Sequence, residues 1–165
     1  MKLHIKELPF SLTAVHGAHR LETLGQWKAL WALSPRCTRL SKIDDKLPDG
    51  SYLKAIRELT RQQSSLLMQL RMGHIPLNGY LHRIGKLERP DCHLCSHGAE
   101  TVHHYLFECR AHDHARHKLA RKLGSKAKSL KHLLGNKRAL KPLLKFVGES
   151  ERFKATYGNV IPLDI

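Results

Sequence analysis

The residue types best suited to chemistry gather between positions 91 and 110. Two residues separate Cys92 from Cys95, eight more precede His104, and a further four precede Cys109, which gives the pattern C-x2-C-x8-H-x4-C. Three thiolates and one imidazole form a donor set that Zn²⁺ takes in closed tetrahedral sites. The spacing therefore predicts one structural zinc ion, with no coordination position open to a substrate.

Other residues could compete for these roles. His103 is the alternative imidazole, although the four-residue gap before the last cysteine favours His104. His93 and His97 lie in the expected turn and are predicted to face solvent or to support the ligands. Cys37 lies far upstream, without a partner at metal-ligand spacing. The competing interpretation of the three clustered cysteines is that they are ordinary core residues of a helical domain.

The ligands place a requirement on the element that carries them. A short helix is expected to begin at Glu100 or Thr101 and to present His104. On an ideal α-helix, Cys109 would be rotated by about 140° from His104. The helix must therefore loosen before Cys109 if both side chains are to reach one metal ion.

Hydrophobic periodicity predicts helices on both sides of this cluster and no strand of useful length. The expected fold class is mainly α, a small helical domain with one CCHC zinc knuckle and no extended sheet. The predicted organisation is an N-terminal tail or linker (1–17), a helical region (18–90), the knuckle (91–110), a basic helical region packed on the same domain (111–156) and a tail (157–165).

Residue types at helix ends locate the individual helices. Capping side chains predict helix starts at Ser51, Thr60, Ser125 and Asn136, and breakers predict helix ends at Ser34–Pro35, Gly73, Gly124 and Gly148. Pro142 is expected near the start of the last helix, where its missing N–H costs little.

Positive charge dominates the 165-residue chain, in which 29 Lys and Arg oppose 14 Asp and Glu for a net charge of +15. Twelve of the cations lie between positions 110 and 147, where the single acidic residue is Asp113. A cationic face of this kind suits phosphate binding, because neutralised phosphates release counterions. The alternatives are an ordinary solvated helix face or a surface for anionic lipid. The predicted nucleic-acid contacts are Arg110, Arg116, Lys118, Arg121, Lys122, Lys126, Lys128 and Lys131.

Several classes of protein are not expected. A hydrophobic fraction of 41% is too high for wholesale disorder, and no apolar run approaches the ~20 residues of a membrane span. The first residues lack the apolar segment of a secretory signal, so we expect an intracellular protein, with the nucleus as a candidate compartment. His74 has no nucleophile or carboxylate at recognisable spacing, and we expect no enzyme activity.

Two segments carry a resemblance to a known family. Arg71-Met72-Gly73-His74-Ile75-Pro76-Leu77-Asn78 leads into the cysteine pair, and His103-His104-Tyr105-Leu106-Phe107-Glu108-Cys109 completes it. This combination resembles the C-terminal tail of fungal non-LTR (LINE-type) retrotransposon polyproteins, downstream of reverse transcriptase and RNase H. The resemblance covers roughly residues 20–150 and places the family's zinc ligands on Cys92, Cys95, His104 and Cys109.

The resemblance implies a module without its catalytic domains, because the chain has no Tyr-x-Asp-Asp signature and its acidic residues are scattered. Together, the predicted zinc site and the basic region indicate an RNA- or DNA-binding module of low sequence specificity. The alternative is a zinc-stabilised scaffold or protein-interaction module. The choice between RNA and DNA and the oligomeric state stay open.

Overall fold

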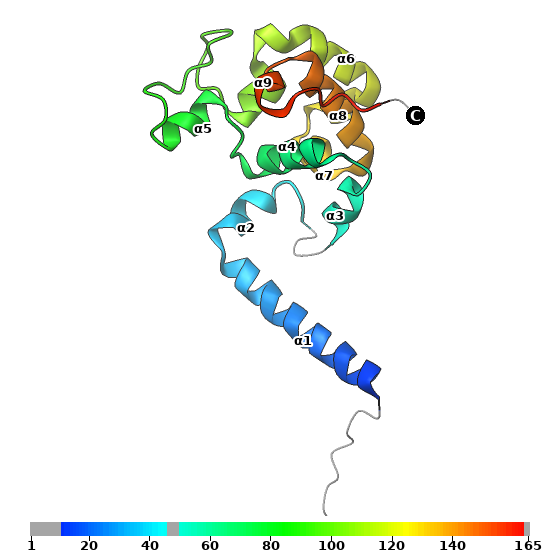
Figure 1. Cartoon of the computed structure of the whole chain (residues 1–165). Coiled ribbons are helices and arrows are strands. Elements are labelled where there is room, and N and C mark those ends of the chain that lie inside the picture. The colour runs from blue at the N-terminus through cyan, green and yellow to red at the C-terminus, as the bar shows by residue number, and fades with distance from the viewer. Residues whose placement is uncertain (1–10, 46–49, 164–165) are drawn as a thin grey trace, which may run out of the picture. The chain divides into compact units, whose positions relative to one another are not determined.

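The computed structural model describes residues 11–45 and 50–163 and is built from helices joined by turns (Figure 1). Within these ranges there is no β-strand, only one isolated antiparallel bridge between Asp91 and Ala99. The predicted fold class, a mainly α helical domain without an extended sheet, is therefore confirmed. The chain divides into two compact units, Met1–Thr38 and Arg39–Ile165. No helix of the described ranges is long and apolar enough to cross a bilayer.

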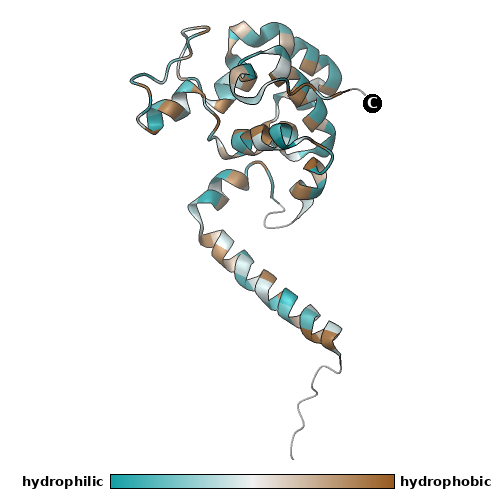
Figure 2. Ribbon diagram, viewed as in Figure 1, coloured by the Kyte–Doolittle hydropathy of each residue, from teal (hydrophilic) through white to brown (hydrophobic). Residues whose placement is uncertain are grey.

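The first unit contains the long helix α1 (Leu12–Leu33), in which no residue is buried. Apolar and polar residues both recur along its length (Figure 2). The predicted tail over 1–17 is wrong for positions 12–17, because the Ser11 side chain accepts a hydrogen bond from the Ala14 N–H and starts the helix there. Residues 1–10 lie outside the described ranges. The helix ends before Pro35, as predicted, and α2 (Pro35–Leu40) follows.

The second unit holds all remaining elements. Before the knuckle come α3 (Ser51–Ile56), α4 (Arg61–Met72) and α5 (Asn78–Arg83). After it come the π-helix η1 (His104–Glu108), the 3₁₀ helices η2 (Arg110–His112) and η3 (Gly124–Lys128), and four α-helices: α6 (Asp113–Leu123), α7 (Leu130–Gly135), α8 (Lys137–Glu149) and α9 (Lys154–Tyr157).

The helix ends of the second unit agree in part with the predictions. Thr60 forms a reciprocal capping box with Gln63, and Gly73 ends α4 in the left-handed conformation at φ +65°. Asn136 caps α8, and Gly124 follows the last residue of α6.

Three predicted helix ends and the position of Pro142 are wrong. Ser51 is the first helical residue rather than the cap. Ser129, not Ser125, caps α7, because a 3₁₀ turn intervenes after Gly124. Helix α8 continues past Gly148 to Glu149, and Pro142 lies inside it. A proline there removes one hydrogen bond of the helix.

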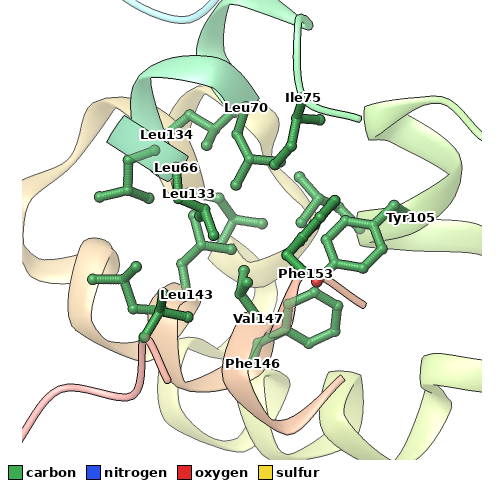
Figure 3. Packing of buried hydrophobic residues seen from close by; sticks show 14 of the residues in the cluster. Leu66, Leu70, Ile75, Tyr105, Leu133, Leu134, Leu143, Phe146, Val147 and Phe153 are labelled. Atoms are coloured by element: carbon green, nitrogen blue, oxygen red, sulfur yellow. The ribbon is translucent and has the colours of Figure 1, made fainter. Parts of the chain in front are cut away.

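The core forms where α4, α7 and α8 meet (Figure 3). Leu66, Leu133 and Leu143 are completely buried, and Tyr105 and Phe146 extend the cluster toward the knuckle. Burying side chains of this size stabilises a fold by about 1.5–3 kcal/mol each before entropy is subtracted. The knuckle and the basic helices thus share one core.

The predicted tail over 157–165 is wrong for its first part. Tyr157 ends α9 and is buried, and Val160 is 2% exposed within the core. The Gln63 side chain donates a hydrogen bond of 3.1 Å to the Val160 carbonyl. Burial of the Val160 side chain and the hydrogen bond to its carbonyl together hold this segment against the core. Residues 164 and 165 lie outside the described ranges.

Candidate metal centre

The structure brings together the four predicted ligands, Cys92, Cys95, His104 and Cys109, whose donor atoms all lie within 4.8 Å of one another. The sulfurs of Cys92 and Cys109 are 3.8 Å apart, and the Cys95 sulfur is 3.3 Å from His104 Nε2. A tetrahedral zinc ion with Zn–S near 2.3 Å and Zn–N near 2.0 Å would need separations of about 3.8 Å and about 3.5 Å. The donor set therefore fits a closed four-coordinate metal site.

A tight loop presents the first two cysteines. The Cys92 N–H donates to the Gly98 carbonyl at 3.0 Å, and the Ser96 N–H donates to the Cys92 carbonyl at 2.8 Å. Ser96 and Gly98 both have positive φ, 53° and 75°, so the chain reverses within a few residues. The reversal places the two-residue spacer of C-x2-C on the outside and both sulfurs on the same side.

The π-helix η1 positions the other two ligands. Its hydrogen bond from the Cys109 N–H to the His104 carbonyl, 2.8 Å long, spans five residues instead of the four of an α-helix. Upstream, Thr101 Oγ1 accepts from the His104 N–H at 3.1 Å. The expected loosening before Cys109 is thus a π-helical turn, and it lets His104 and Cys109 reach the same point.

Burial and the contact with Cys95 distinguish the two candidate histidines, which both lie against Glu108. His104 turns Nε2 toward Cys95, while its Nδ1 lies 3.4 Å from one Glu108 oxygen. The His103 side chain is 64% exposed, and its Nδ1 lies 2.9 Å from the other Glu108 oxygen. A carboxylate on the far nitrogen is the usual support of a metal-bound histidine. Glu108 was missed in the sequence, although its position four residues after His104 on a helix is the signal.

The thiols differ in their electrostatic surroundings. Burial raises the pKa of Cys109 to about 12, whereas a backbone hydrogen bond of His97 lowers the pKa of Cys95. A metal ion deprotonates the thiols that coordinate it. His93 and His97 are exposed, consistent with their predicted place in the turn, and Cys37 belongs to the first unit.

A buried ion pair joins the knuckle to the segment that follows α8. The Glu100 carboxylate, 1% exposed, accepts two hydrogen bonds of 2.7 Å from Arg152 and one of 2.8 Å from the Asn78 N–H. Asn78 also donates through its side chain to the Asp91 carbonyl at 2.7 Å. Burial opposes ionisation of Glu100, but these hydrogen bonds outweigh it and hold its pKa below the ordinary value. Sequence inspection missed Arg152, because only the tertiary fold places it here.

The first motif of the family resemblance also has structural contacts. The buried Arg71 side chain pairs with Asp44 at 3.0 Å, lies over the Tyr52 ring at 3.7 Å and donates to the Leu134 carbonyl. His74 is exposed and stacks on Tyr80 with ring centroids 5.3 Å apart.

The predicted nucleic-acid contacts differ in their availability. Arg116 donates to the carbonyls of Leu106 and Cys109 at 3.0 and 2.7 Å and pairs with Asp113, so its guanidinium already has partners beside the candidate metal centre, and its role as a phosphate contact stays a prediction. Lys118 pairs with Glu149 at 3.3 Å, and Lys131 with Asp45 at 2.8 Å. The remaining five are exposed and have no ion pair within the described ranges: Arg110, Arg121, Lys122, Lys126 and Lys128.

No protein-family model, curated protein or solved structure matches this chain. The fold and the site therefore define it only as a small helical protein with a Cys₃His cluster that could hold a metal ion.

Proposed function

We propose that this chain is a zinc-stabilised nucleic-acid-binding module. The observation that carries the proposal is the group of five exposed cations without ion pairs in the described ranges, which follows the metal centre directly along the chain. Cations not neutralised by protein carboxylates can bind phosphates without first breaking an internal pair. The proposal includes no catalytic step.

Zinc is the proposed metal because of the donor set. Thiolate-rich tetrahedral sites favour Zn²⁺ over oxygen-seeking cations such as Mg²⁺. Cys92, Cys95, His104 and Cys109 would hold the ion, which would join the knuckle loop to η1. With all four positions filled by protein, the ion would act on stability rather than on a substrate.

Zinc content tests the metal assignment. The purified protein is expected to carry about one zinc ion per chain, measured by mass spectrometry, as for other four-ligand sites. The double variant Cys92→Ser, Cys95→Ser should lose the ion and melt at a lower temperature. Cys37→Ser is the matched control and should retain the ion. Full zinc content and thermal stability in the double variant would contradict the assignment.

A salt titration tests nucleic-acid binding. Affinity for labelled RNA or DNA, measured by fluorescence anisotropy, should fall with a log–log slope of about −0.9 per duplex phosphate contacted, or about −0.7 for single strands. Neutralising Arg121, Lys122, Lys126 and Lys128 to Gln should weaken binding by about tenfold or more.

The matched control for charge removes four exposed cations elsewhere, Lys54, Arg57, Arg61 and Lys86, each to Gln. This variant should retain most of the affinity. Absence of binding at low salt, or an equal effect of the two variants, would instead favour a zinc-stabilised scaffold whose charge serves solubility.

The proposal also includes an origin in a LINE-type retrotransposon polyprotein, and the segments around Arg71–Asn78 and His103–Cys109 support it. Genomic sequence upstream of this coding region tests the idea. A reverse transcriptase reading frame, intact or decayed, is expected there, and an unrelated gene would count against it.

A further inference from the structure

A groove runs between α6 and α8, with a volume of about 740 Å³. Its lining also includes Ile161 and Pro162, which follow α9. This volume falls in the range of sites that hold small organic ligands, roughly 300–1,000 Å³. We propose that this groove is the nucleic-acid site itself and that it takes one single strand, held by its phosphates. The inference rests on the proposed function and sharpens it.

Two rows of cations border the groove. Lys118, Arg121 and Lys122 project from α6 at spacings of three and four residues, which places them on one face of that helix. Lys141 and Lys145 form the second row, one turn apart on α8. Glu149 is the only acidic residue in the lining, so the groove carries a net charge of +4.

The floor between the two rows is apolar. Leu119 and Phe146 are buried beneath it, and Pro142 and Pro162 are half-buried along it. Pro142 contributes a pyrrolidine ring, which carries no N–H donor, to this lining. Apolar surface between cations suits sugar and base faces, whereas phosphates would lie at the rims.

The concave shape favours one strand over two. A groove bordered by cations on both sides directs them toward a single phosphate backbone. Duplex DNA presents a rigid convex cylinder whose two backbones are separated by about 12 Å across the major groove, so it fits a groove less well than a flexible single strand does. A single strand should therefore make more phosphate contacts here than a duplex of equal length.

The test compares two variants of the full, zinc-loaded chain that each lose one Arg and two Lys. The groove variant is Arg121→Gln, Lys141→Gln, Lys145→Gln, and the control is Lys54→Gln, Lys86→Gln, Arg138→Gln, three exposed cations that lie outside the groove lining and are not among the predicted contacts. The probe is a fluorescent 12-nucleotide oligo(U), with oligo(dT) and the corresponding duplexes as competitors. The groove variant should bind about tenfold or more weakly, and the control within about threefold of the native chain.

Glu149 supplies a variant that should gain affinity. Its carboxylate lies 3.3 Å from Lys118 Nζ and competes with phosphate for that cation. Glu149→Gln should tighten oligo(U) binding on the order of fivefold, since like charges near contact cost about 1 kcal/mol in water. A damaged fold would weaken binding instead, so a gain cannot come from misfolding.

The outcomes separate the two proposals. Selective loss in the groove variant, a gain in Glu149→Gln and weaker competition by duplex would support the single-strand groove. Equal loss in both triple variants, a Glu149→Gln affinity that does not rise or equal competition by duplex would overturn it, while nucleic-acid binding would stand. A native chain that binds no probe at low salt would overturn both.

Discussion

At the scale of single residues, the candidate metal centre has neighbours that the ligand pattern does not contain. Glu108 lies against His104 and also against the exposed His103. Within the knuckle, Glu100 forms a buried ion pair with Arg152 and also accepts a hydrogen bond from the Asn78 N–H. The C-x2-C-x8-H-x4-C pattern supplies the donor atoms, and these neighbours orient them.

Histidine variants should separate the direct ligand from its neighbours. His104→Ala should abolish stoichiometric zinc binding. The zinc affinity of His103→Ala should stay within about threefold of the native value, because the His103 side chain faces solvent. Glu108→Gln should lower zinc affinity by about 10- to 100-fold, the usual effect of removing a group that supports a ligand. Competition with a chromophoric chelator measures all three. Stronger loss in His103→Ala than in His104→Ala would reverse the assignment.

The Glu100–Arg152 pair should affect stability in a pH-dependent way. The pKa of Glu100 is lowered in the folded chain from its ordinary 4.5, so its contribution is complete above about pH 4.5 and disappears as pH falls through the folded-state value. Glu100→Gln should cost about 3 kcal/mol at pH 7, the typical result of leaving a partner of a buried pair uncompensated.

Urea unfolding of zinc-loaded protein between pH 3 and pH 7 measures this effect. Below about pH 4.5, the native chain should lose stability faster than Glu100→Gln as the Glu100 carboxylate is protonated. Protonation of the metal ligands occurs in both proteins and does not contribute to this difference. The exposed Glu88→Gln is the matched control and should follow the native curve. Parallel curves for native chain and Glu100→Gln would contradict the assigned ionisation.

At the scale of elements, helix ends decide where the ligands and cations lie. The capping box of Thr60 and Gln63 starts α4, and left-handed Gly73 ends it, so the chain turns toward α5 and the knuckle. The π-helical turn η1 then brings His104 and Cys109 to one point. Each device is local, so single substitutions can test it.

Thr60→Ala should destabilise the protein by about 1 kcal/mol, because the Gln63 N–H loses its acceptor at the start of α4. Thr156→Ala, a change of the same type at an exposed position in α9, should stay within about 0.5 kcal/mol. Thermal and urea unfolding measure both. Equal effects would mean that the cap contributes nothing specific.

At the scale of the whole molecule, the two compact units should be separable. Helix α1 buries none of its side chains, whereas the core is formed by residues of the second unit. A chain of residues 35–165 should therefore keep its cooperative unfolding, with a midpoint within about 3 °C of the full chain. Circular dichroism measures this, and loss of cooperativity would show that α1 is needed for folding.

The availability of the positive charges is also a property of the whole molecule. Most of the net charge of +15 comes from residues 110–147, yet the fold gives those cations different roles. Arg116 binds backbone carbonyls beside the ligands, Lys131 pairs with Asp45, and Lys141 and Lys145 border the groove. A count of cations therefore overstates what is available for phosphate.

The amino-acid sequence by itself determined the helical class, the four residues of the candidate metal centre and the caps at Thr60, Gly73 and Asn136, because periodicity, donor type and capping chemistry act over a few neighbouring residues. Only the tertiary structure decided that Arg116 donates to the Cys109 carbonyl, that Val160 is buried and that Arg152 forms an ion pair with Glu100. The groove between α6 and α8 belongs to this second group. Such features depend on which distant segments pack together, and a local pattern does not encode that.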